Sequence, residues 1–250
     1  MAKLIICNWK ENPATLKEAL ELAHASDASN VVIAAPFPFL GAVKSVVSKA
    51  KLAAQDVFYE ASGAFTGAVS ASQLYSIGVR YVIVGHSERR RLGDTDAIVS
   101  KKIREVIDAG LIPILCVGET KEEHAKGEAK KVIEKQLTKA LSELKTSEPF
   151  TMLVAYEPVW AISTEKGAKP DTPENAVSMI QYLSQVLHDS LDDTYRKQTV
   201  QMIYGGSVNG KNAKAFLGKP EITGALIGGA SLKPLEIQDI INSAKVIHNQ

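Results

Sequence analysis

Glu157 is the residue whose surroundings in the sequence point most directly to chemistry. It follows an apolar run at residues 152–156, and Pro158 comes directly after it. A carboxylate at a strand end is usually exposed to solvent, and a proline there often only ends the strand. The alternative is a catalytic base, held at the strand end and desolvated by the neighbouring aromatic residues. The rest of the chain decides between these interpretations.

Two other apolar runs also end in side chains that could take part in a reaction. Asn8 and Lys10 are two positions apart, so in an extended chain they face the same side, where they suit an anionic substrate. His86 follows Gly85, and imidazole exchanges protons readily near neutral pH. Each has an ordinary interpretation as well, because a lysine at a strand exit is usually solvated and a lone histidine is usually structural.

A repeated glycine pattern predicts a phosphate site. Gly-Gly pairs stand before Ser207 and, as Gly228 and Gly229, before a small residue further along. One pair would be a weak signal, but two pairs on consecutive strands suggest bare backbone N–H groups that hold a phosphate. A carboxylate, an imidazole, a cation and a phosphate anchor, without a metal-ligand cluster or cofactor motif, predict proton abstraction next to a carbonyl.

The elements that must position these residues form a regular alternation. Eight short apolar runs, rich in Val, Ile, Leu and Ala, read as strands covered on both faces. Helical patterns separate them, with a capping box at Thr15 and Glu18, a terminating glycine at Gly110, and Thr172 before Pro173 at a further helix start. Eight units in 250 residues predict an α/β fold, a closed parallel (β/α)8 barrel with residues 1–250 as a single domain. An open doubly wound sheet is the alternative, but no dinucleotide fingerprint follows the first strand.

The composition narrows the class of protein. A net charge of +1 gives no excess of positive charge with which to bind nucleic acid. The apolar runs are too short to cross a membrane. The N-terminal sequence does not have the pattern of a signal peptide, because its apolar run is short and no small-residue cleavage site follows it. The two cysteines, Cys7 and Cys116, lie inside predicted strands and read as reduced core residues of a cytoplasmic protein.

With these motifs in place, the sequence closely resembles the triosephosphate isomerase family over essentially its whole length. The resemblance is carried by NWK (8–10), GAFTG (63–67), GHSERR (85–90), CVGE (116–119), AYEPVWAI (155–162), YGGSV (204–208) and GGASL (228–232). It implies an isomerase of glycolysis and gluconeogenesis that interconverts dihydroxyacetone phosphate and D-glyceraldehyde 3-phosphate. The implied proton transfer passes through an enediolate and uses no cofactor. Another phosphate-binding barrel, such as an aldolase or a synthase of an aromatic amino-acid pathway, would leave GHSERR and AYEPVW without a role. Loss of Glu157, His86 or Lys10 would indicate a non-catalytic binding module, and all three are present.

The resemblance also implies individual roles. Glu157 is expected to be the base and His86 the group that polarises the carbonyl, with Lys10 and Asn8 steadying the negative charge. The phosphate is expected at the backbone N–H groups of four residues: Ser163, Ser207, Gly228 and Gly229. Glu88 is expected to orient Lys10. A lid over residues 159–168 is expected to close through contacts from Tyr204 to Ala168 and from Ser207 to Glu165.

The loop around Gly63–Gly67 implies a partner. In the family this loop inserts into a neighbouring subunit, so a homodimer is expected, with Thr66 near the partner's Asn8 and Lys10. Ala68 stands where the family usually has a glutamate, which removes an expected partner for the arginines of SERR and is expected to loosen the contact. The lid carries Ser163 and Glu165 in place of glycines.

Overall fold

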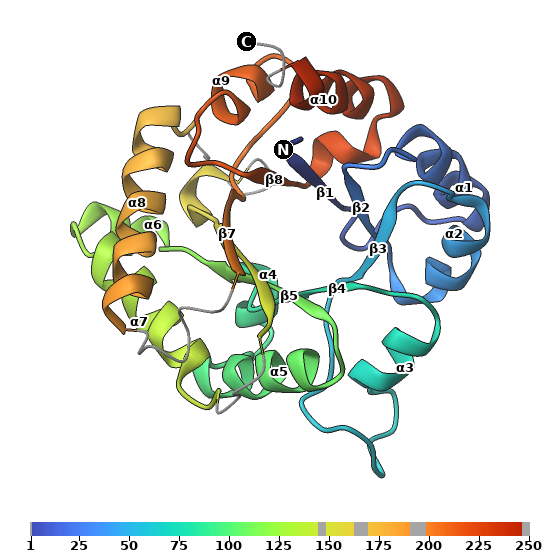
Figure 1. The fold of residues 1–250 in the computed structure, drawn as a ribbon, viewed down its shortest axis with the longest axis horizontal. Coiled ribbons are helices and arrows are strands. Elements are labelled where there is room, and N and C mark those ends of the chain that lie inside the picture. The colour runs from blue at the N-terminus through green and yellow to red at the C-terminus, as the bar shows by residue number, and fades with distance from the viewer. Residues whose placement is uncertain (1, 145–148, 163–169, 191–198, 247–250) are drawn as a thin grey trace.

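Eight parallel strands form a closed barrel in which each strand pairs with its neighbours in sequence and β8 returns to β1 (Figure 1). The computed structural model describes residues 2–144, 149–162, 170–190 and 199–246. The strands are β1 (Leu4–Asn8), β2 (Val31–Ala34), β3 (Lys51–Ala54), β4 (Tyr81–Val84), β5 (Ile112–Val117), β6 (Thr151–Tyr156), β7 (Thr199–Tyr204) and β8 (Gly224–Ile227). The predicted (β/α)8 barrel is therefore confirmed.

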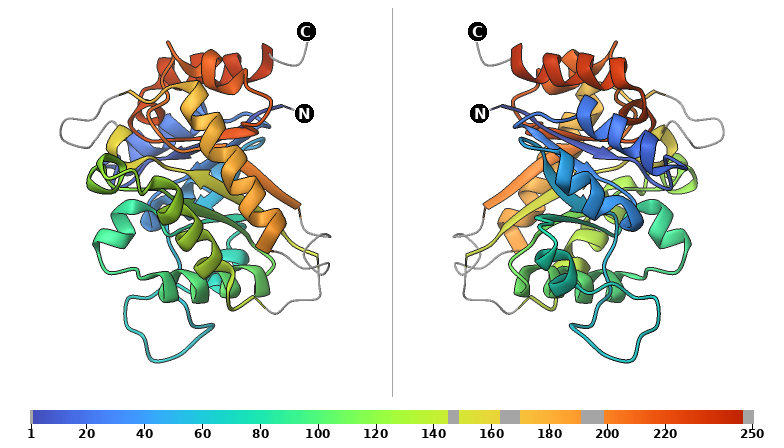
Figure 2. Two further views of the ribbon diagram at one scale, coloured as in Figure 1. Left: turned by 90° about the vertical axis from the view of Figure 1, so that its left-hand side faces the viewer. Right: turned by 90° about the vertical axis from the view of Figure 1, so that its right-hand side faces the viewer.

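Helices surround the barrel on all sides (Figures 1 and 2). The α-helices are α1 (Leu16–Ala25), α2 (Leu40–Val46), α3 (Ala71–Ser76), α4 (Ser87–Arg91), α5 (Asp96–Asp108), α6 (Lys121–Ala125), α7 (Ala129–Leu141), α8 (Pro173–Ser190), α9 (Ala213–Leu217) and α10 (Pro234–Val246). Short 3-10 turns are η1 (Phe37–Phe39), η2 (Val159–Ala161) and η4 (Gly229–Leu232). The loop between β3 and α3 projects well beyond the helical ring (Figure 2).

Local signals set the helix ends where the sequence predicts them. Thr15 and Glu18 form the expected capping box at the start of α1. α8 begins at Pro173, and the Thr172 hydroxyl accepts the Asn175 N–H at 3.2 Å. Gly110 follows α5 with a φ of 73°, a left-handed conformation that glycine adopts without strain. The polar residues before these helices thus pair with N–H groups that the helices leave unpaired.

The alternation of side chains along each strand divides the core into two parts. Inside the barrel lie residues such as Ile6, Ile83 and Ala155. Their sequence neighbours on the other face, such as Val84 and Tyr156, pack beneath the helices. Side chains alternate between these two cores along each strand, and the same alternation determines which residues at the strand ends point into the mouth of the barrel.

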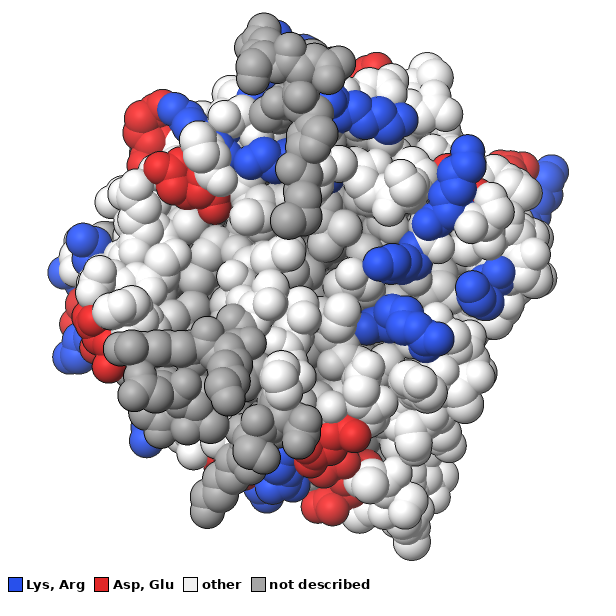
Figure 3. Space-filling model, in the orientation of Figure 1, with Lys and Arg blue, Asp and Glu red and all other residues white. Residues whose placement is uncertain are grey.

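Charged side chains lie mainly around the edge of the face shown in Figure 3. Lys and Arg predominate on the side of α1 and α2, while both signs occur together on the opposite side. Within the described part of this face, no continuous basic track crosses the centre. Among the described residues, none of the helices combines the length and the apolar composition that a bilayer crossing requires.

Candidate active site

The predicted site residues converge at one end of the barrel. A small hollow of about 30 Å³ lies there, at the ends of β1, β4, β6, β7 and β8. Its lining residues are Asn8, Lys10, His86, Glu157, Ile162, Gly205, Gly206, Ser207, Val208, Leu226, Gly228, Gly229 and Ala230. Every predicted site residue among these comes from a strand end, and Ser163 lies outside the described residues.

Strand alternation brings Asn8 and Lys10 to the hollow and turns Trp9, which is fully buried, toward the helices. Lys10 has a φ of 54°, an uncommon conformation for a residue with a side chain. The Asn8 side-chain oxygen accepts the Lys10 N–H at 3.1 Å, and Gln55 donates to the Lys10 carbonyl at 2.9 Å. These two hydrogen bonds support the unusual backbone. The Lys10 Nζ lies 2.6 Å from Glu88 Oε1, so Glu88 is placed to orient it.

His86 enters the site through a turn at Gly85. Because Ile83 faces the barrel interior, strict alternation would point His86 outward. Gly85 adopts a φ of 72°, which ends the alternation and redirects the next side chain. His86 then precedes α4, where its Nδ1 accepts the Glu88 N–H at 3.2 Å. The neutral ring therefore carries its proton on Nε2, which faces Glu157.

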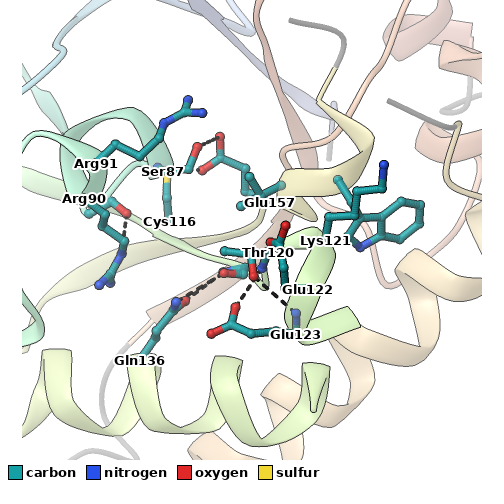
Figure 4. Close-up of a pocket in the computed structure, with 14 residues that line it drawn as sticks. Ser87, Arg90, Arg91, Cys116, Thr120, Lys121, Glu122, Glu123, Gln136 and Glu157 are labelled. Atoms are coloured by element: carbon teal, nitrogen blue, oxygen red, sulfur yellow. Dashed lines mark hydrogen bonds between the residues drawn. The ribbon is translucent and has the colours of Figure 1, made fainter. Parts of the chain in front are cut away.

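Glu157 lies inside the mouth because Ala155, two positions earlier, also faces the barrel interior. The side chain is 3% exposed, and Oε1 is 2.9 Å from His86 Nε2. The N–H and the hydroxyl of Ser87 both donate to its carboxylate at 3.2 Å. Figure 4 shows Ser87 facing this carboxylate. The base candidate is therefore held by donors from the β4–α4 turn.

The same contacts shift the ionisation of both groups. Burial alone would raise the pKa of Glu157, but the His86 imidazole and the Ser87 N–H outweigh it and hold the pKa below its usual value. Burial disfavours a charged His86, yet the Glu157 carboxylate raises the pKa of His86 while the two are in contact. The Glu88 N–H opposes the rise in the pKa of His86. It donates to Nδ1, so protonation of that nitrogen would set two donors against each other.

The hollow must open to admit a ligand. Its volume of about 30 Å³ is far below the roughly 300–1,000 Å³ of an ordinary small-molecule pocket. On the other side of Glu157 lies a larger cavity of about 530 Å³, which Ser87, Cys116 and Trp160 help to line (Figure 4). Glu157 lines both spaces, so the larger cavity offers its carboxylate room to move away from His86.

The phosphate side of the hollow consists mostly of backbone. A Cβ built on Gly206 would stand 2.2 Å from the Tyr204 hydroxyl, so only glycine fits there. A Cβ on Gly228 would stand 3.6 Å from the Lys10 side chain, and one on Gly229 would meet nothing within 4 Å. The two predicted glycine pairs, with Ser207, therefore border an accessible backbone surface next to a cation, which suits an anion.

Tyr204 makes a contact that the sequence did not predict. The lid contacts expected from Tyr204 to Ala168 and from Ser207 to Glu165 lie outside the described residues. In this structure the Tyr204 hydroxyl donates to Asp171 Oδ2 at 3.1 Å.

A fully buried carboxylate behind β6 was also missed. Glu119 accepts hydrogen bonds from the Trp160 indole at 2.7 Å and from the Tyr156 hydroxyl at 3.1 Å. His124 stacks on Trp160 with ring centroids 4.3 Å apart. The CVGE motif could have indicated this residue, because Glu119 closely follows β5 as Glu157 follows β6. Glu119 therefore fixes the chain that leaves β6.

The described residues contain no group of three or more His, Cys, Asp or Glu side chains that could hold a metal ion.

Comparison with known proteins places this site in context. The family model described as triosephosphate isomerase matches residues 3–244. A relative of that name from Dehalococcoides mccartyi is 42% identical, and the alignment covers 100% of both chains. One from Dictyoglomus thermophilum is 38% identical over 96% of this chain and 99% of its own. One from the fungus Coprinopsis cinerea is 41% identical, with 95% and 96% covered.

Proposed function

Since the chain belongs to the triosephosphate isomerase family, and so interconverts dihydroxyacetone phosphate and D-glyceraldehyde 3-phosphate, we propose that Glu157 is the base of this reaction. The carboxylate removes a proton from the carbon next to the carbonyl and returns it to the neighbouring carbon. The lowered pKa of Glu157 supports this role, because the base is already ionised at neutral pH.

His86 acts on the substrate oxygens in this proposal. Its Nε2–H donates to the carbonyl oxygen as the enediolate forms, and the same nitrogen then moves protons between the two oxygens. The hydrogen bond from the Glu88 N–H to Nδ1 supports this role, because it keeps the ring proton on Nε2. A neutral histidine electrophile is the established pattern for this family.

Lys10 and Asn8 stabilise the negative charge that develops. The ammonium of Lys10 lies beside Gly228, next to the backbone surface proposed for the phosphate. Glu88 orients Lys10 through the 2.6 Å contact. The N–H groups of Ser207, Gly228 and Gly229 hold the phosphate, and Ser163 completes that set. Tyr204 supports the site from behind.

The convergence of Glu157, His86 and Lys10 on one hollow is the observation that carries this assignment. A coupled assay on the purified chain tests it: isomerase turnover is expected in both directions without added metal or cofactor. A folded protein that binds triose phosphate without turning it over would favour the alternative of a non-catalytic binding module.

We also propose a homodimer with isologous contacts through the β3–α3 loop. Phe65 in this loop is 45% exposed, and two apolar side chains outside it, Leu16 in α1 and Phe37 in η1, are 47% and 38% exposed. A neighbouring subunit would cover such apolar side chains. Because Ala68 stands where the family usually has a glutamate, the arginines of SERR are expected to lack an acidic partner. One of them has such a partner within the chain. Arg89 lies 3.0 Å from Asp56, so it is neutralised without a neighbouring subunit.

Residues 1–250 act as a single catalytic domain in this proposal, and the protein works in the cytoplasm. The match of one family over residues 3–244 supports the first point. The glycolytic role of the family supports the second.

A further inference from the structure

Asp171 bridges two elements near the site, and none of the roles above uses it. Its Oδ1 accepts the Thr172 N–H at 2.8 Å and the Asn175 side-chain amide at 2.8 Å, both at the start of α8. Its Oδ2 accepts the Tyr204 hydroxyl at 3.1 Å, at the end of β7. One carboxylate therefore joins the start of α8 to the strand that leads into the proposed phosphate site.

Tyr204 has little freedom to move once this bond is made. The side chain is fully buried, and its ring stacks on Phe216 with centroids 4.4 Å apart and planes 9° from parallel. Its hydroxyl lies so close to Gly206 that a Cβ there would stand only 2.2 Å away. The Tyr204 hydroxyl therefore packs directly against the backbone at Gly206.

Gly206 and the following residue, Ser207, line the hollow on its phosphate side. A buried hydroxyl without a partner is unfavourable, so loss of the Asp171 carboxylate would make Tyr204 move or draw in water. Either change would displace the backbone at Gly206. The half-buried Asp171 has a raised pKa, mainly because of burial, so the carboxylate lies in a partly dry environment where a hydrogen bond counts for more.

We propose that Asp171 is a positioning residue for phosphate recognition: through the Tyr204 hydroxyl it fixes the Gly206–Ser207 backbone against which the substrate phosphate binds. The proposal rests on the function proposed above and deepens it. Asp171 touches neither the substrate nor the reacting atoms; it acts through Tyr204.

The test measures the inhibition constant of inorganic phosphate and the KM of the triose phosphate. Asp171→Ala is expected to raise both by about threefold to tenfold, the effect of losing one hydrogen bond. Asp171→Asn keeps polar groups toward both elements and should restore most of the affinity. Asn175→Ala is the matched control, since it removes another bond to the same carboxylate while leaving the Tyr204 contact, and phosphate inhibition should be unchanged.

A double-mutant cycle separates this role from a purely structural one. In a Tyr204→Phe background, Asp171→Ala should have almost no further effect on phosphate inhibition. An equal effect in both backgrounds would show that Asp171 acts through α8 alone and would overturn the proposal, as would an unchanged inhibition constant in Asp171→Ala. If Asp171→Ala does not fold, Tyr204→Phe alone must raise the constant to a similar extent. Failure of the proposed function is a different result, namely a wild-type protein without turnover.

Discussion

The contact between Glu157 and His86 joins the proposed base directly to the proposed electrophile. With Oε1 only 2.9 Å from Nε2, no substrate atom fits between the two groups, so the proposed reaction requires them to separate. Ser87 supplies two donors that hold Glu157 there, and the cavity of about 530 Å³ behind it provides space for movement. We therefore expect Ser87 to affect how readily the proposed base separates from His86.

The Ser87 contact has a measurable consequence for ionisation. The pKa of Glu157 is held below its usual value, so the carboxylate is lost only when the pH falls through that lowered pKa. Ser87→Ala removes one donor to the charged form and should raise the pKa of Glu157. Titration of the side-chain carboxyl by ¹³C NMR on the substrate-free protein measures this without interference from the substrate phosphate. A Glu157 that titrates above an ordinary glutamate in the wild type would contradict the structure.

His86→Gln should reduce kcat much more than it raises KM. The polarising hydrogen bond strengthens as charge develops on the oxygen, so its loss is felt mainly in the transition state. General acid–base catalysis is worth about 10²–10⁴-fold, which sets the expected loss in kcat. Steady-state kinetics in both directions provide the measurement. A variant with altered KM and wild-type kcat would assign His86 to binding alone.

Several of these residues could be found from the sequence because strand periodicity determines them. Asn8 ends β1 and Glu157 follows an inward-facing Ala155, so alternation places both. Lys10 was predicted on the same face as Asn8 and does reach the hollow, although its φ of 54° is not extended. His86 is different, because it depends on the positive φ at Gly85, which reverses the expected direction. Ser87 and Asp171 were missed since their roles lie in hydrogen bonds across elements, and no local pattern encodes these.

At the scale of elements, Glu119 connects β5 to the chain that follows β6. Besides accepting from Trp160 and Tyr156 through its side chain, it accepts the Val159 N–H through its backbone carbonyl at 3.1 Å. The position of η2, directly after Glu157, therefore depends on one buried carboxylate.

Glu119→Gln tests that dependence. Trp160 and Tyr156 both donate to Oε1, and a neutral amide oxygen is a weaker acceptor than a carboxylate, so each hydrogen bond should weaken by about 1 kcal/mol. Thermal unfolding should show lower stability, and kcat should fall because the segment after Glu157 is less well fixed. Glu122→Gln, on an exposed position of α6, is the matched control and should change neither quantity. Equal stability of Glu119→Gln and the wild type would show that the cluster contributes little.

The order of the elements was the most predictable feature, since eight apolar runs of strand length leave few other arrangements. The helix starts at Thr15 and Thr172 followed equally from local capping chemistry. The lid residues 163–169 lie outside the described part of the chain, so predictions about Ser163 and Glu165 stay predictions.

At the scale of the whole molecule, the proposed dimer depends on the projecting loop (Figure 2). Phe65→Ser should shift sedimentation toward the monomer and lower activity, because the loop is proposed to reach the partner's site. Leu235→Ser is the matched control: Leu235 is 80% exposed but lies on α10, away from this loop. A wild-type protein that sediments as a fully active monomer at assay concentration would refute the dimer.

The most direct test of the central claim is the kcat/KM of Glu157→Gln. The substitution preserves the size of the side chain and removes the proposed base. The kcat/KM should therefore fall by at least about 10²-fold, the lower end of the range for general acid–base catalysis. Exchange of the substrate carbon-bound hydrogen with solvent should fall in parallel, while thermal unfolding confirms that the variant is folded. A loss of only a few-fold, with exchange intact, would show that another group removes the proton.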